Sequence, residues 1–330
     1  MPSGMANERL FDLVSYARRG PGRRDHLSPG EIAQVARTVR RTPEVMVKVL
    51  GRGGQDLKAV GRHLDYLRLR DEGELGLETD DGRRLTGDTV TQELLESWDL
   101  DLEEHRRRSD LDARGGGSTK LVHKLLFSMP AGTPPDKVLG AVKNFAREEF
   151  GLKHRYAMVL HIDEPHPHVH LVVKAVSEQG VRLHIRKATL REWRSEFAGH
   201  LRALGVAANA TQRYVRGETS PRKSDGIYRA GLRGESTHLR ARAEAVAQEL
   251  VQGKLRIEPG KARLVGTRNE VQRAWLAVGD ILIRERQPEL AAHVRRFADQ
   301  MGPPLTEKEW VATRIAERAR EPRVREGPTH

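Results

Sequence analysis

The apolar positions of the chain change period several times, and each change marks the boundary of a predicted element. Runs rich in strand-forming residues occupy residues 44–51, 120–129, 156–163 and 168–176. Apolar residues recur every three or four positions, as on one buried helix face, at residues 56–70, 136–150 and 190–205. This mixed order, with the last two strands as an antiparallel pair, predicts an α+β fold in which helices flank a central antiparallel sheet.

The segments on either side of this central region are helical in pattern. Near the start, Ser28 followed by Pro29 and Glu31 has the pattern of an N-cap, a first-turn proline and a capping-box glutamate. We therefore expect three parts. They are a basic helical N-terminal extension at 1–42, a central domain at 43–233 and a mostly helical C-terminal region at 234–330.

Two local patterns add detail to the C-terminal region. Residues 254–266, KLRIEPGKARLVG, predict a β-hairpin that turns at Pro259 and Gly260. The last helix is predicted to begin at Thr306, because Glu309 three residues later completes a capping box.

Composition narrows the possible partners and chemistry. Lys and Arg number 58 against 46 Asp and Glu, and the net charge of +12 favours an anionic partner such as nucleic acid. The alternative is a solvated basic surface without such a partner. The chain has no cysteine, so a metal ion would have to bind His, Asp or Glu. Without an apolar run of about 20 residues or a signal-peptide core, we expect a cytoplasmic protein with no membrane span.

The segment HIDEPHPHVH concentrates titratable side chains between two predicted strands. If these strands form a hairpin, alternation places His161 and Asp163 on one face of the first strand, and His168 and His170 on one face of the second. The simplest register sets Asp163 opposite His168 and His161 opposite His170, with Cβ atoms about 4.5–5.5 Å apart. Three imidazoles would then converge on one divalent ion, with Asp163 supporting a ligand from behind and His166 in the loop. The alternative is a polar strand face without an ion.

A tyrosine lies on the polar side of the helix predicted at 56–70. The apolar stripe of that helix contains Leu57, Val60, Leu64 and Leu67. Tyr66 is about 180° from Leu57 around the helix, on the side of Arg62. The alternative is a tyrosine half-buried against another element. A metal ion that polarises a phosphate, a tyrosine that attacks phosphorus and a basic surface together indicate DNA strand transfer.

Three segments resemble, in the same order, the motifs of relaxases, the mobilisation nucleases of plasmid conjugation, in their VirD2-like group. They are VKVLGRGGQDLKAVGRHLDYLRLRDEGELGLE, KLVHKLLFSMPAGT and HIDEPHPHVHLVV. A weaker fourth likeness, TQRYVRGETSPR, extends the resemblance to residues 44–228. The resemblance implies an HUH-endonuclease-like fold and an enzyme that nicks one DNA strand at an origin of transfer, leaving a 5′-phosphotyrosine.

The same resemblance implies roles for individual residues. Tyr66 would be the nucleophile, and Ser128 would contact DNA near the nick. The implied metal ligands are His161, His168 and His170, with Asp163 in a supporting catalytic role. Candidate DNA contacts are Arg62, Arg70, His166 and Lys174. Lys174 occupies a position where the family often has asparagine.

The implied cofactor is a divalent metal ion, with manganese or magnesium favoured. The implied partners are single-stranded DNA at an origin of transfer, accessory mobilisation proteins and the coupling machinery of type IV secretion. Residues 314–330, with spaced arginines, resemble the C-terminal export signals of type IV secretion substrates, and the alternative is a frayed basic end.

Other functions remain open at this point. A rolling-circle replication initiator would use a downstream tyrosine, Tyr214 or Tyr228. A non-catalytic DNA-binding protein could retain a vestigial site, and a metal-dependent hydrolase of small phosphates would leave Tyr66 unexplained.

Overall fold

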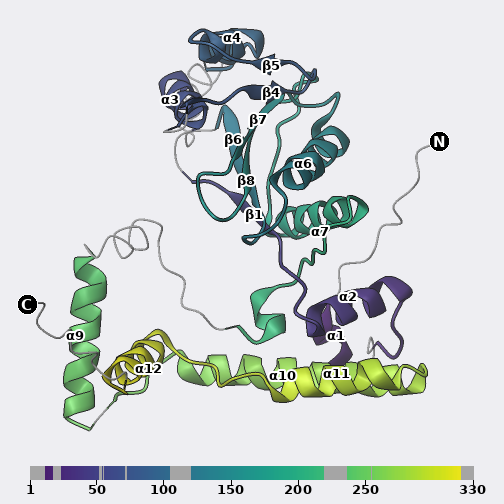
Figure 1. Ribbon diagram of the computed structural model, residues 1–330, viewed down its shortest axis with the longest axis vertical. Coiled ribbons are helices and arrows are strands. Elements are labelled where there is room, and N and C mark those ends of the chain that lie inside the picture. Colours follow the sequence, from purple (N-terminus) through teal and green to yellow (C-terminus); the bar gives the residue numbers. More distant parts are fainter. Residues whose placement is uncertain are drawn as a thin grey trace, which may run out of the picture. The chain divides into compact units, whose positions relative to one another are not determined.

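The structure is a computed structural model that describes residues 12–17, 24–51, 54, 56–70, 73–104, 120–218, 236–253 and 255–320. The described residues form two compact units (Figure 1). The sheet unit comprises Arg41–Ala210, and the helical unit comprises Phe11–Arg40 together with Thr211–His330. The compact units group the N-terminal helices with the C-terminal ones. The functional domain boundaries expected at residues 42 and 233 stay predictions.

A six-stranded antiparallel sheet forms the centre of the sheet unit and confirms the predicted α+β class. Its order is β1 (Met46–Val49), β6 (Val122–Ser128), β8 (His168–Lys174), β7 (Tyr156–His161), β4 (Leu77–Thr79) and β5 (Arg84–Leu85). A separate ribbon pairs β2 (Leu69–Arg70) with β3 (Gly73–Glu74). Residues that pair directly across neighbouring strands project from the same face, so the register assigns each side chain to a face.

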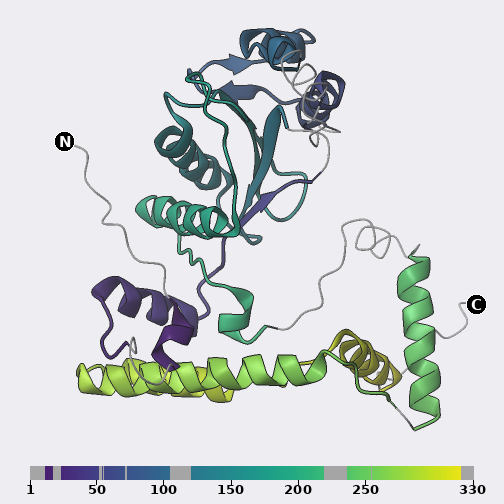
Figure 2. The ribbon, with the colours of Figure 1, turned by 180° about the vertical axis from the view of Figure 1, so that it is seen from behind.

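One face of the sheet is covered by α6 (Pro135–Phe150) and α7 (Lys187–Ala203), as Figures 1 and 2 show from opposite sides. An aromatic core fills this interface, with Phe127 of β6 against Phe145 and Phe145 against Trp193. Burial of such side chains contributes about 1.5–3 kcal/mol each.

The opposite face is covered over part of its width by α3 (Leu57–Arg68) and α4 (Val90–Ser97). The predicted apolar stripe of α3 is buried there, and Leu64 packs in one core with Trp98 and Val159. The remaining part of this face carries polar side chains, among them histidines of β7 and β8. This division of one face into an apolar and a polar part positions the candidate site.

The region of β4, β5 and α4 was left without elements by the sequence pattern. These strands contain only three and two residues, too few for alternation to be visible. They form because Glu78 and Thr79 pair with Met158 and Ala157 of β7, a contact between distant parts of the chain.

Two residues at the start of α3 hold this helix on the sheet. Asp56 is the N-cap, and its side chain accepts a hydrogen bond from the Ala59 N–H at 2.7 Å. Gly54 lies directly against β6, where an added Cβ atom would be 2.5 Å from the carbonyl oxygen of Val122.

The helical unit is formed by segments from both ends of the chain. Its elements are α1 (Leu13–Ala17), α2 (Pro29–Val39), the 3-10 turn η1 (Arg213–Arg216), α9 (Thr237–Val251), α10 (Lys261–Arg284), α11 (Pro288–Asp299) and α12 (Glu307–Arg320). One apolar core joins α1, α2, α10 and α11, and it includes Leu13, Trp275 and Val294.

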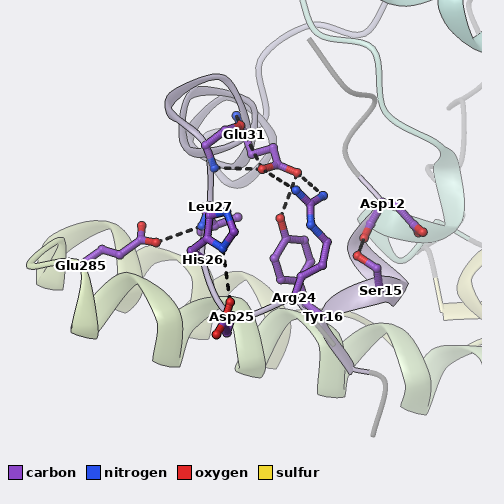
Figure 3. A network of polar contacts seen from close by, with 10 residues as sticks. Asp12, Ser15, Tyr16, Arg24, Asp25, His26, Leu27, Glu31 and Glu285 are labelled. Carbon is purple, nitrogen blue, oxygen red and sulfur yellow. Dashed lines mark hydrogen bonds and ion pairs between the residues drawn. The ribbon is translucent and has the colours of Figure 1, made fainter. Parts of the chain in front are cut away.

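A buried carboxylate connects the N-terminal helices of this unit (Figure 3). Glu31 accepts hydrogen bonds from the Tyr16 hydroxyl at 2.9 Å and from Arg24 at 2.6 Å. It also accepts from the backbone N–H of Ser28 at 2.9 Å, which confirms the predicted capping box. Burial, followed by the hydrogen bond to Glu31, raises the pKa of Tyr16.

The hairpin predicted at residues 254–266 is wrong. Lys261 begins α10, and Gly260 is its N-cap. The reason is that Val271, Trp275 and Val278 continue a helical period and bury one face of α10, which outweighs the short strand-like run before it. The capping box predicted at the last helix is confirmed, since Thr306 and Glu309 exchange hydrogen bonds at 2.8 and 3.3 Å.

Within the part of the chain that the structure describes, no helix is long and apolar enough to cross a membrane. Residues 321–330, most of the segment that resembles an export signal, lie outside the described residues.

The close approach at Gly54 generates a stability prediction. We expect Gly54→Ala to lower the free energy of unfolding by about 1–3 kcal/mol, because its methyl group would press on the Val122 carbonyl. Gly51→Ala is the matched control, since a Cβ atom there meets nothing within 4 Å. Denaturant unfolding of both variants checks this, and equal stabilities would contradict it.

A buried histidine predicts how stability depends on pH. His123 of β6 forms a hydrogen bond through Nε2 with the Leu183 carbonyl at 3.1 Å, and burial lowers the pKa of its imidazole to about 4. Between the ordinary histidine pKa of about 6.5 and this value, the unfolded chain binds a proton that the folded chain does not. Stability is therefore expected to fall as the pH is lowered through this range.

The His123→Gln variant lacks this titrating group. As the pH is lowered from about 6.5 to about 4, the stability of the variant should therefore decrease less steeply than that of the wild type. Denaturant unfolding at a series of pH values measures the two slopes. His184→Gln, at an exposed histidine, provides the control and should follow the wild type. Parallel slopes for His123→Gln and wild type would show that His123 does not carry this dependence.

Candidate metal centre

Three histidine side chains meet on the polar part of the sheet face. In the register of β7 and β8, His161 pairs with His168, while His170 pairs with Val159. The ring centroids are 5.2 Å apart for His161 and His168, 4.8 Å for His161 and His170, and 5.4 Å for His168 and His170. All three are buried, and one nitrogen of each lies within 4.8 Å of the others. The predicted convergence of these imidazoles is therefore present in the structure.

The register predicted for this hairpin was wrong by two residues. His161 lies opposite His168, and not opposite His170, because β7 ends at His161 and residues 162–167 form the connection. A shift of two residues keeps every side chain on its face, so the cluster survives the error. Asp163 falls in the connection and is exposed.

The outer nitrogens of two histidines are held by backbone carbonyls. His161 donates from Nε2 to the Leu67 carbonyl at 2.9 Å, and His168 donates from Nδ1 to the His166 carbonyl at 3.0 Å. These bonds select the tautomers that leave Nδ1 of His161 and Nε2 of His168 as lone-pair donors. Carbonyl groups thus occupy the supporting position that the sequence analysis assigned to Asp163.

This donor set fits a divalent metal ion. Three neutral imidazoles with an open remaining coordination position are typical of catalytic metal sites. Two of the rings are already oriented by hydrogen bonds, which reduces the entropy lost when an ion binds. His161, His168 and His170 would hold the ion.

Tyr66 lies in the last turn of α3, next to this cluster. Its side chain is 50 % exposed, whereas the following residue, Leu67, is fully buried. Because the Leu67 carbonyl accepts the hydrogen bond from His161, the backbone at Tyr66 is one residue from a direct contact with the histidines. The structure thus brings the candidate nucleophile and the candidate ligands together.

The other tyrosines have different surroundings. Tyr156 is buried in the core beneath α6 and α7, and Tyr16 is buried in the helical unit. Tyr214 packs at the edge of the helical-unit core. Tyr228 lies outside the described residues.

Ser128 is at the end of β6, directly opposite His168, and it is buried. Its side chain therefore projects from the same face as the histidine cluster. Lys48 of β1 belongs to this face too, because it pairs with Leu126, which in turn pairs with His170. Lys48 is exposed, so a basic side chain borders the cluster on the β1 side.

Two further residues of this face were not assigned from the sequence. His63 of α3 lies with its ring centroid 6.3 Å from that of His170, and Lys124 of β6 is buried four residues before Ser128. Burial, followed by the charges of Lys124 and His161, lowers the pKa of His63 to about 4, so His63 is neutral at pH 7. The sequence contained a signal for each residue. Lys124 precedes Ser128 by four residues, so strand alternation places both on one face. His63 precedes Tyr66 by three residues, so both lie on the same side of the helix.

The candidate DNA contacts are dispersed. Arg62 is exposed on α3, and the side chain of Arg70 lies outside the described part of the structure. His166 is exposed and accepts a hydrogen bond at Nδ1 from the Ala131 N–H at 2.9 Å. Lys174 is buried at the far end of β8 and pairs with Glu178 at 3.2 Å. The structure does not bring the other three residues, Arg62, His166 and Lys174, together.

Comparison with known proteins bears on the central part of the chain. The family model described as the nuclease domain of MobA/VirD2-like relaxases matches residues 76–200. No curated protein matches the chain. A solved structure concerned with the molecular basis of vancomycin resistance transfer in Staphylococcus aureus is 15% identical, with a TM-score of 0.32, over 52% of this chain and 99% of that chain.

The family match confirms the resemblance inferred from the motifs. Its span includes Ser128, His161, His168 and His170, and it begins after Tyr66. Residues 76–200 are therefore similar to a relaxase nuclease domain, while the assignment of the nucleophile depends on the geometry described above.

Metal binding by the cluster can be tested without any DNA. We expect the wild type to bind one Mn²⁺ or Ni²⁺ ion per chain, and His170→Gln to weaken this binding by at least about tenfold, because a ligand nitrogen is lost. Isothermal titration calorimetry measures both. The exposed His184→Gln should bind like the wild type, and unchanged affinity in His170→Gln would exclude this cluster as the site.

Proposed function

We propose that this chain, whose residues 76–200 match the nuclease-domain model of MobA/VirD2-like relaxases, nicks one strand of DNA at an origin of transfer. The nick is made by transesterification, with Tyr66 as the nucleophile and a 5′-phosphotyrosine as the covalent intermediate. The reaction serves conjugative transfer or mobilisation of DNA, and it starts in the cytoplasm of a bacterial cell.

The hydrogen bond between His161 and the Leu67 carbonyl is the observation that carries this proposal. It connects the strand with the candidate metal ligands to the helical turn with the only exposed tyrosine among those described in the sheet unit. An exposed phenol beside buried imidazoles is poorly explained by core packing. It is well explained by a nucleophile that must reach a phosphate from outside.

In the proposed reaction, the phenol oxygen of Tyr66 attacks phosphorus and the bond from phosphorus to the 3′ oxygen breaks. The phenol loses a proton, the departing 3′ oxygen gains one, and the 5′ phosphate stays on Tyr66. A divalent ion held by the three histidines would supply positive charge to the non-bridging oxygens of the scissile phosphate. Because one phosphodiester replaces another, the strand can be reclosed by the reverse reaction.

The remaining residues position the substrate in this proposal. Ser128, directly opposite His168, contacts the strand near the nick. Lys48 and Arg62, both exposed, approach backbone phosphates. Asp163, exposed in the connection between β7 and β8, is assigned to proton transfer.

The role of Tyr66 predicts a specific chemical product. Incubation of the wild type with Mn²⁺ and a single-stranded origin oligonucleotide should give a protein–nucleotide adduct on Tyr66, detected by mass spectrometry, and a free 3′-hydroxyl fragment. Tyr66→Phe should abolish the adduct and leave DNA binding intact, because only the attacking oxygen is removed.

Tyr214→Phe and Tyr228→Phe are the matched controls for the same assay, and both should retain the adduct. Loss of the adduct only in Tyr228→Phe would favour a rolling-circle initiator with a downstream nucleophile. Cleavage that persists in the presence of a chelator would remove the metal from the mechanism.

A further inference from the structure

Lys124 is a buried cation on the sheet face that carries the histidine cluster. It is 9 % exposed, and it lies on β6 two residues before Leu126, which pairs with His170. Such a diagonal pair has Cβ atoms about 7–8 Å apart, so Lys124 is a close neighbour of the cluster. Its charge also contributes to the lowered pKa of His63 on the overlying helix.

Lys124 has no counter-charge within the described residues. Its own pKa is lowered by burial and then by the charge of Lys120, and no carboxylate opposes these effects. The other buried lysine of this sheet, Lys174, is paired with Glu178 at 3.2 Å. Buried lysines are almost always paired, because removing an ammonium group from water costs several kcal/mol. At Lys124 the stem is largely buried, and the ammonium group is not among the fully buried atoms without a partner, so it is open to a ligand from solvent.

The surroundings of Lys124 point to an anion supplied from outside. His63 beside it has Nε2 buried and without a hydrogen-bond partner in the described part of the structure. Two nitrogen atoms on this face thus have unused hydrogen-bonding capacity next to the histidine cluster. In the proposed function, the anion that lies on this face is the phosphate backbone of a DNA strand.

We propose that the ammonium group of Lys124 binds a backbone phosphate of the single-stranded substrate next to the histidine cluster. This inference rests on the proposed function for the presence of DNA on this face. The phosphate supplies the missing counter-charge, and the contact is independent of base sequence.

Separate measurements of stability and binding make the proposal testable in the full chain. Lys124→Met should not lower the melting temperature of the free protein, because Met keeps the apolar stem and removes an ammonium group that burial disfavours. If Lys124 were needed for the fold, the melting temperature would fall.

Binding is measured with a fluorescein-labelled mixed-sequence single-stranded oligonucleotide, in a Tyr66→Phe background that keeps the strand intact. Lys124→Met should weaken binding about tenfold or more. It should also make the slope of log Kd against log salt shallower by about 0.7, the value for one phosphate contact on a single strand. Lys153→Met, which removes an exposed charge after α6, should leave both quantities unchanged.

The outcomes separate this inference from the proposed function. An unchanged salt slope in both Lys124→Met and Lys124→Gln would overturn the phosphate contact, and so would a lower melting temperature in both. If the Tyr66 adduct still forms in the wild type, nicking stands without this contact. If no adduct forms but the slope changes as expected, Lys124 binds phosphate in a protein that does not nick.

Discussion

The hydrogen bond from His161 to the Leu67 carbonyl is the contact on which the candidate site depends. It joins the end of β7 to the last turn of α3, across 94 residues of chain. The bond selects the tautomer of one candidate ligand and holds the backbone beside Tyr66 in place. A single polar contact thus links a candidate metal ligand to the helical turn that carries Tyr66.

The sheet face that carries this contact is divided by what covers it. Over part of the face, small and branched side chains such as Ala157 and Val172 are sealed by α3 and α4. Elsewhere on the same strands, the face carries the histidine cluster. The buried side of α3 packs in the apolar core, while Tyr66 on its other side is exposed.

The face also contains groups that the free protein leaves unsatisfied. Lys124 is largely buried and has no counter-charge among the described residues, and the Nε2 of His63 is fully buried without a hydrogen-bond partner there. In the helical unit, by contrast, the buried Glu31 has all its polar partners and serves only to hold α1 and α2.

The sequence alone predicted the helices and strands whose apolar residues recur at a regular spacing, and the motifs that contain the candidate site residues. The stripe of α3, the strands β6, β7 and β8, both capping boxes and the family of the nuclease domain were all readable from it. The tertiary structure decided the hairpin register, the short strands β4 and β5, and the carbonyl partners of the histidines. It also decided that α1 and α2 pack with α10, and that Lys124 is largely buried with no counter-charge among the described residues. These features arise from contacts between distant segments, and a local pattern contains no information about which distant surface will cover it.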